Sequence, residues 1–147
     1  MISLIQRVSE ASVTVDGEIT GQIARGLLAL VAVQPDDTPA TIKRMADRVL
    51  TYRVFPDAEH RMNRSLLDEE LELLLVPQFT LAADTKKGTR ASFTRAAPPD
   101  KARDYFGRFV VECQQRLPRV ATGVFGADMQ VALVNDGPVT IMLDSRE

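Results

Sequence analysis

This chain has very few of the residues that build disulfides, zinc sites or histidine-based catalytic centres. Among its 147 residues there is no tryptophan, and cysteine and histidine occur once each, as Cys113 and His60. A lone cysteine excludes an internal disulfide framework, and the two residues together are too few to hold a structural zinc ion. We therefore expect no metal site and no cofactor.

Long hydrophobic runs and an excess of one charge are missing as well. No apolar segment approaches the roughly 20 residues of a membrane span. Residues 1–15 alternate too regularly to form a signal peptide. The formal net charge is only −2. We expect a cytoplasmic protein with no membrane contact, which would meet a nucleic acid through a local basic patch rather than through its overall charge.

The residues that are present describe a globular protein of one domain, residues 1–147, with 45% hydrophobic and 26% charged residues. Two apolar runs, residues 27–33 and 73–76, are hydrophobic on both faces, which is typical of strands in the middle of a sheet. Asp16-Gly17 between alternating segments predicts a hairpin. The other predicted strands are residues 2–8, 11–15, 18–23, 120–125, 129–134 and 139–143.

Two helices are predicted by apolar residues at helical spacing. One begins near Pro39, with Asp37 or Thr38 as its cap, and the other begins at Pro98-Pro99. Cys113 falls on the apolar face of the second helix, so we interpret it as a small buried residue rather than a nucleophile. Together, the strands and helices predict an α/β fold.

The segment that follows the second apolar run is the first candidate for a ligand site. Pro77 cannot donate to a β-ladder, so pairing is broken or bulged there. Beyond it we expect extended geometry to Leu81, with Gln78 and Thr80 on one face and Phe79 on the other. A polar strand end beside a basic loop suits an anionic ligand. A buried strand followed by an ordinary solvated turn is the alternative.

Basic residues are concentrated after this segment, although the protein as a whole is acidic. They are Lys86, Lys87, Arg90, Arg95, Lys101, Arg103 and Arg108. Such a local patch fits contacts to phosphates. A solvated loop and helix face is the alternative interpretation.

Other polar clusters carry weaker signals. Asp68, Glu69 and Glu70 could act as paired carboxylates, but a solvated turn before a buried strand explains them as well. His60 has no nucleophile near it in sequence, which favours a surface position. Asn135-Asp136-Gly137-Pro138 predicts a turn between the last two strands, and an Xaa-Pro bond is where a cis peptide is least costly.

Two motifs make the sequence resemble a known family. Residues 76–88, VPQFTLAADTKKG, and residues 135–140, NDGPVT, are similar to the two signature motifs of the D-aminoacyl-tRNA deacylases of the bacterial type. The resemblance runs nearly from end to end, since it also includes residues 1–8, 11–15, 52–55 and 127–131. A match of this extent is far more specific than one short motif.

The resemblance implies a homodimer with a compact, β-barrel-like mixed or antiparallel sheet and two main helices packed outside. It implies hydrolysis of the ester between a D-amino acid and the terminal ribose of tRNA, with glycyl-tRNA as a second substrate. In the family a cis glycine-proline pair enters the partner's pocket, where its carbonyls hold the α-amino group and exclude an L side chain. The matching residues are Gly137 and Pro138, and Arg7 matches an arginine that braces them.

One position departs from the family pattern. The motif usually carries serine where this chain has Pro77. Without a hydroxyl there, and without a His/Asp partner set, an acyl-enzyme at position 77 is excluded. Pro77 also occurs in related animal-type deacylases with a different chirality profile, so relaxed chirality is an alternative. Phe79 and the intact Gly137-Pro138 pair favour the D-specific type.

Hydrolysis of a labile aminoacyl ester needs positioning and oxyanion stabilisation rather than an activated side chain. We expect Gln78, Phe79 and Thr80 to be the catalytic residues, with backbone amides around Phe79 and Thr80 stabilising the oxyanion. Gln78 and Thr80 would orient the terminal adenosine or the water. The expected contacts to tRNA phosphates are Lys86, Lys87 and Arg90.

Two rival functions stay open. The protein could be a non-catalytic homodimer that binds tRNA or another anion through its basic patch. It could also be an esterase of small acyl substrates that uses His60.

Overall fold

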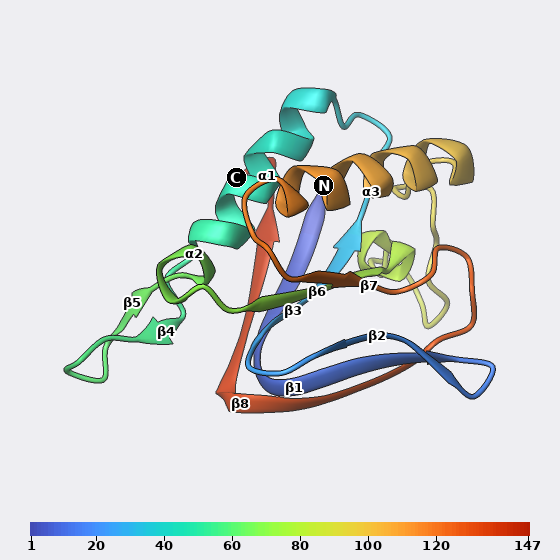
Figure 1. Ribbon diagram of the computed structural model, residues 1–147. Helices are drawn as coiled ribbons and strands as arrows, with labels where there is room; N and C mark the ends of the chain where they lie inside the picture. The colour runs from blue at the N-terminus through green and yellow to red at the C-terminus, as the bar shows by residue number, and fades with distance from the viewer.

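Two long strands, β1 (Ile2–Val15) and β8 (Gln130–Asp144), pair with each other along most of their length and form the framework of the sheet. The structure is a computed structural model that describes residues 1–147. In Figure 1 both strands bend at the lower left, so that the sheet curves back over itself. The remaining strands of this sheet are β2 (Glu18–Ile23), β3 (Gly26–Ala32), β6 (Glu72–Pro77) and β7 (Val120–Thr122).

The sheet is mixed and nearly closes into a barrel, as expected from the resemblance. Its order is β2-β1-β3-β6-β7, with β8 on β1. β1 pairs antiparallel with β2, β3 and β8, whereas β6 is parallel to both β3 and β7. The two ends meet at Gly21, where a Cβ atom would lie 2.5 Å from the backbone oxygen of Thr122. Only glycine allows this close approach.

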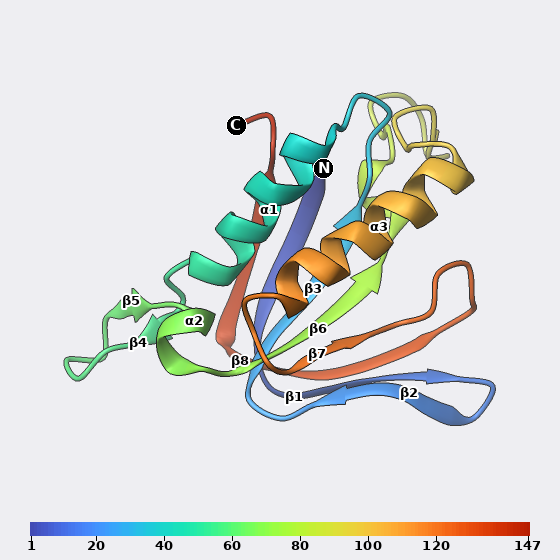
Figure 2. The same ribbon diagram turned by 45° about the horizontal axis from the view of Figure 1, so that its top comes forward.

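Two main helices, α1 (Pro39–Thr51) and α3 (Pro99–Gln114), cover one face of the sheet. Figures 1 and 2 show them side by side above β3 and β6. Shorter elements connect them: the hairpin β4 (Phe55–Pro56) and β5 (Met62–Arg64), the short helix α2 (Leu66–Glu69) and a 3₁₀ turn, η1 (Phe79–Ala82). No helix is long and apolar enough to span a membrane.

The central strands are buried on both faces, as their continuous apolar sequences predicted. Along β6, Leu73 and Leu75 belong to the core beneath the helices, and Leu74 and Val76 belong to a second core inside the barrel. All four side chains are fully buried. The period of two along a strand therefore places alternate residues in two different cores.

Four sequence-based boundaries were wrong. Residues 2–15 form one strand instead of two, and β7 ends at Thr122 rather than at residue 125. Residues 59–70, expected to be irregular, contain β5 and α2. Residues 130–144 form one continuous strand, so Asn135–Pro138 is not a turn between two strands.

The bend within β8 is a bulge. Both halves of the strand remain paired with β1, through Gln6 to Thr140 on one side and Val8 to Asn135 on the other. Between these pairs β8 uses more residues than β1, and the surplus residues bulge out of the ladder. Because β1 continues past the bulge, the turn-forming residues bend the strand without reversing it.

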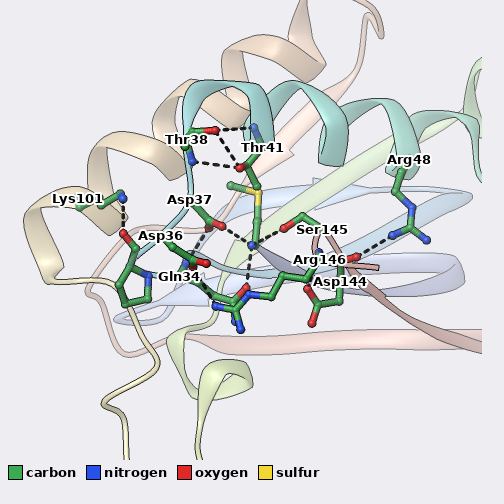
Figure 3. A network of polar contacts seen from close by, with 12 residues as sticks. Gln34, Asp36, Asp37, Thr38, Thr41, Arg48, Lys101, Asp144, Ser145 and Arg146 are labelled. Atoms are coloured by element: carbon green, nitrogen blue, oxygen red, sulfur yellow. Dashed lines mark hydrogen bonds and ion pairs between the residues drawn. The ribbon is translucent and has the colours of Figure 1, made fainter.

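Both ends of the chain are fixed beside the start of α1. The N-terminal ammonium of Met1 donates to Asp37 Oδ1 at 2.5 Å, Ser145 Oγ at 2.7 Å and Gln34 Oε1 at 2.9 Å. Figure 3 shows these acceptors converging from the loop before α1 and from the end of β8. Thr38 caps α1, and Asp37 is instead the buried partner of the ammonium.

Candidate active site

The end of β6 turns sharply instead of continuing as a strand. Pro77 pairs with Val31, and the N–H of Gln78 makes a last bond to the Val31 oxygen at 2.8 Å. The chain then enters η1, where Leu81 N–H bonds to the Gln78 oxygen. The expectation of a strand to Leu81 was therefore wrong, because neighbouring β3 ends at Ala32 and offers no further ladder partner.

This turn brings together the three residues expected to be catalytic. The Gln78 amide donates a hydrogen bond to the Thr80 hydroxyl, so their side chains do meet. The N–H groups of Phe79 and Thr80 precede the first bonded N–H of the turn, and such groups have no partner within a helical turn. The site thus offers a hydroxyl, an amide and two adjacent N–H donors at the surface.

An apolar pocket of about 300 Å³ opens beside this turn. Gln78 and Phe79 form one part of its wall, and the first residues of α3 form another. Gln78 is the one polar side chain that lines it, and no charged side chain does. The lining residues are Val31, Ala32, Val33, Pro77, Gln78, Phe79, Ala96, Ala97, Pro99, Ala102, Phe106, Phe125 and Gly126.

An exposed aromatic pair flanks the pocket. The Phe79 side chain is 57% exposed and meets the ring of Phe93 edge to face, with centroids 5.0 Å apart and planes inclined at 65°. Two exposed phenylalanines in contact at a pocket mouth are typical of a surface that stacks against a planar ligand.

The basic loop after η1 is closed at its base and open at its tip. Asp84 and Ser92 exchange two backbone hydrogen bonds, of 2.7 and 3.0 Å, and the Asp84 carboxylate lies 3.7 Å from Arg95. The three cations at the tip are Lys86, Lys87 and Arg90, all exposed and without an ion pair to any carboxylate. This arrangement leaves their charge available to an anionic ligand.

The Gly137–Pro138 peptide bond is cis, as the resemblance implied. Gly137 has φ +133°, and a Cβ atom there would lie 3.0 Å from Arg7 Nη2 and 2.9 Å from a methyl carbon of Val139. Glycine is therefore required at this position. Gly137 and Pro138 are both exposed on the bulge of β8.

Arg7 lies against this bulge. Its Nε donates to the backbone oxygen of Asp136 at 3.0 Å, and its Nη1 donates to the backbone oxygen of Val54 at 2.7 Å. The Arg7 side chain is only 13% exposed. A rigid guanidinium thus ties the peptide just before the cis bond to the segment that follows α1.

Within one chain the two groups of predicted site residues do not meet. The pocket beside Gln78 and Phe79 includes neither Arg7 nor Gly137 nor Pro138. Figure 1 shows the bend of β8 at the lower left and the light-green turn after β6 at the right. Figure 2 also keeps them apart.

The remaining candidates have structural surroundings. His60 is exposed in the turn between β4 and β5. Asp68 accepts from the backbone N–H of Ser65 in a capping box of α2, and Glu69 pairs with Arg64. Cys113 is fully buried, and burial raises the pKa of its thiol to about 12. A neutral, inaccessible thiol is a poor nucleophile.

Sequence reasoning missed the rest of the pocket. Phe93 carried a usable signal, since it is a lone aromatic residue in a basic, polar segment. Phe125 and Arg103 carried none, because they approach each other only when β7 and α3 pack together.

Comparison with known proteins agrees with this geometry. The D-Tyr-tRNA(Tyr) deacylase family matches residues 4–144. A protein of Stenotrophomonas maltophilia named D-aminoacyl-tRNA deacylase is 60% identical, over 97% of this chain and 99% of its own. The solved structure of a c-Myc DNA unwinding element binding protein superposes with a TM-score of 0.94 at 37% identity, covering 98% of each chain.

A second solved structure, described as a probable eukaryotic D-amino acid tRNA deacylase, shares the fold at 19% identity. It has a TM-score of 0.80 and covers 97% of each chain. The family match and the high identity to the Stenotrophomonas protein extend over nearly the whole sequence. This chain belongs to the D-Tyr-tRNA(Tyr) deacylase family, in its bacterial branch.

Proposed function

We propose that this chain hydrolyses the ester between a D-amino acid and the terminal ribose of tRNA, releasing the amino acid and the free tRNA. The observation that carries the proposal is its 60% identity, over nearly its whole length, to a protein named D-aminoacyl-tRNA deacylase. The cis Gly137–Pro138 bond and the polar turn at Gln78–Thr80 support it.

In this mechanism the ester carbonyl lies against the start of η1. The N–H groups of Phe79 and Thr80 donate to the oxyanion that develops as water attacks the carbonyl carbon. Gln78 and Thr80 orient the water or the terminal adenosine through their hydroxyl and amide groups. The vicinal 2′-hydroxyl of the ribose assists the attack, and the 3′-oxygen leaves with a proton to complete the hydrolysis.

The apolar pocket next to this turn takes the base of the terminal adenosine. It lies directly beside Gln78 and Phe79, and its wall includes the rings of Phe79, Phe106 and Phe125. A purine is the largest planar group at the end of the substrate, and apolar walls with aromatic rings favour such a group. With the base held there, the ribose ester falls at the mouth of the pocket beside η1.

Discrimination between D and L substrates comes from Gly137 and Pro138 of a second copy of the chain. In one copy these residues are exposed and lie away from η1, so they reach a pocket only in a homodimer. Their carbonyls would hold the α-amino group and leave no room for an L side chain. Glycine has no side chain, so the same filter admits glycyl-tRNA.

Pro77 removes the hydroxyl that the family motif usually has at this position, and the mechanism does not need it. Pro77 pairs with Val31 and forms part of the pocket wall. The ester is labile enough for positioning and oxyanion stabilisation to suffice. We therefore propose that the D-specific reaction is retained.

Deacylation of D-Tyr-tRNA and L-Tyr-tRNA by the purified protein, without added metal, tests the proposal. Rapid loss of the D ester alone is the expected result. Loss of neither ester, together with equal affinity for acylated and free tRNA, would replace the proposal with the tRNA-binding homodimer. Loss of both would show that Gly137 and Pro138 do not act as a filter. His60→Ala is the control, and it should leave the D-ester rate unchanged.

A further inference from the structure

One arginine at the edge of the pocket is held in place by an aromatic ring and by nothing else. The guanidinium carbon of Arg103 lies 4.8 Å from the centroid of the Phe125 ring. Phe125 and its neighbour Gly126 both line the pocket, and a Cβ atom on Gly126 would lie 3.8 Å from Arg103 Nη2. The charge of Arg103 therefore lies immediately outside the pocket.

Arg103 differs from the other cations of α3 because its N–H groups bond to no protein acceptor. Lys101 Nζ donates to the oxygen of Pro35 at 2.6 Å, and Arg108 Nη2 lies 3.1 Å from Asp104 Oδ2. Arg103 takes part in no ion pair and in no side-chain hydrogen bond, and its side chain is exposed. Stacking on a ring orients a guanidinium while its donors stay free.

The space on either side of Arg103 suits a nucleotide chain. On one side is the pocket, whose lining has no charged side chain. On the other side Arg103 lines an open groove between α1 and α3, together with Arg108 and Gly107. A nucleotide whose base enters the pocket must carry its 5′-phosphate out past the rim, towards the rest of the strand.

We propose that Arg103 binds the 5′-phosphate of the terminal adenosine, and that Phe125 positions its guanidinium for this contact. This inference rests on the proposed function, because it takes the terminal nucleotide of tRNA as the occupant of the pocket. A planar guanidinium with free N–H donors matches a phosphate better than an ammonium does, since it makes two parallel bonds. Arg103 is a substrate-binding residue in this proposal, and Phe125 is a positioning residue.

Competition with two non-hydrolysable analogues tests the contact. Both are 3′-deoxy-3′-(D-tyrosylamino)adenosine, one with a 5′-phosphate and one with a free 5′-hydroxyl. Their inhibition constants are measured against deacylation of D-Tyr-tRNA. The wild-type protein should bind the phosphorylated analogue about tenfold more tightly, as expected for a charge-assisted pair. In Arg103→Met this ratio should fall to about one, while the constant for the unphosphorylated analogue stays the same.

Two further variants separate a phosphate contact from loss of charge or of structure. Arg108→Met removes the same charge from the same helix, but its guanidinium is paired with Asp104, so the ratio should stay near the wild-type value. Phe125→Leu keeps the pocket apolar and removes the stacking ring, so the ratio should fall as it does in Arg103→Met.

Three outcomes would overturn the inference: equal wild-type affinity for both analogues, an unchanged ratio in Arg103→Met, or an equal loss of affinity for both analogues in that variant. The proposed function fails separately, by an absence of D-Tyr-tRNA deacylation. In that case, direct calorimetric titration of the same two analogues still measures the preference for phosphate.

Discussion

Arg7 donates a hydrogen bond from Nε to the backbone oxygen of Asp136, 3.0 Å away, at the peptide just before the cis Gly137–Pro138 bond. Its Nη1 donates a second bond to Val54, at 2.7 Å. The two acceptors belong to segments far apart in the sequence, and the mostly buried guanidinium holds them in a fixed relation. The position of the two filter carbonyls therefore depends on this one side chain.

Arg7→Lys should lower the rate on D-Tyr-tRNA and reduce the ratio of D to L turnover. A lysine cannot make both bonds with one planar group, and loss of a charge-assisted bond of about 1.5–3 kcal/mol corresponds to roughly tenfold or more. Arg48→Lys is the matched control, because Arg48 Nη1 also donates to a β8 carbonyl, that of Asp144, at 2.9 Å. Initial rates on both esters would measure the effect. Equal rates for Arg7→Lys and the wild-type protein would contradict the bracing role.

Pro77→Ser should change the D-Tyr-tRNA rate by no more than about threefold, in either direction, because oxyanion stabilisation rather than a nucleophile carries the reaction. Backbone pairing of residue 77 with Val31 can persist with serine, and the small side chain remains at the pocket wall. Single-turnover rates, with mass spectrometry of the quenched protein, provide the measurement. A covalent aminoacyl adduct on the new serine together with a large rate increase would show that the mechanism is wrong.

The buried strands could be predicted from sequence because their pattern reflects a local property. Leu73 to Val76 are apolar without interruption, and that pattern has one solution in a sheet with a core on each side. The helices were equally legible, since apolar residues recur at helical spacing and Thr38 provides a cap. In each case the information lies within one segment.

The errors arose where a distant partner decides the conformation. Gln78–Leu81 has β-compatible residues, but β3 ends before it and leaves nothing to pair with, so the chain turns. Asn135–Pro138 has the residues of a turn, but β1 continues past it and keeps both halves of β8 in one strand. The contact between Arg103 and Phe125 also depends on how α3 packs. Local propensity contains no information about these partners.

Lys86→Ala with Lys87→Ala should weaken tRNA binding at low salt and reduce the slope of log K against log salt by roughly one. Both side chains are exposed and lack an ion pair with a carboxylate, so a phosphate would displace only counterions. Lys43→Ala with Arg44→Ala removes the same charge from the exposed face of α1 and is the control. Binding measured from 50 to 200 mM salt decides the matter, and identical slopes for the two double variants would exclude the loop as a contact.

Cys113 should make the protein less stable in alkali. Burial raises the pKa of its thiol from 9.0 to about 12, so between these values the unfolded chain ionises while the folded chain stays neutral. The folded state then binds more protons, and the free energy of unfolding falls as pH rises above 9, by up to about 1.4 kcal/mol per pH unit. Urea unfolding of the wild-type protein and Cys113→Ala from pH 8 to 10.5 should show the wild-type advantage shrinking. A constant difference would contradict the raised pKa, and the D-ester rate should be unchanged in Cys113→Ala.

Asp37→Asn should cost roughly 3 kcal/mol of unfolding free energy, because it leaves a buried ammonium without its counter-charge. Both partners of this pair are almost fully buried, at 0% and 4% exposure. The neighbouring pair of Asp36 and Arg146 has a similar 2.9 Å separation but lies at the surface, with exposures of 69% and 50%. Asp36→Asn should therefore change stability by only about 0–1 kcal/mol. Urea unfolding at pH 7 compares the two variants, and equal losses would show that the solvent, rather than Asp37, balances the charge of Met1.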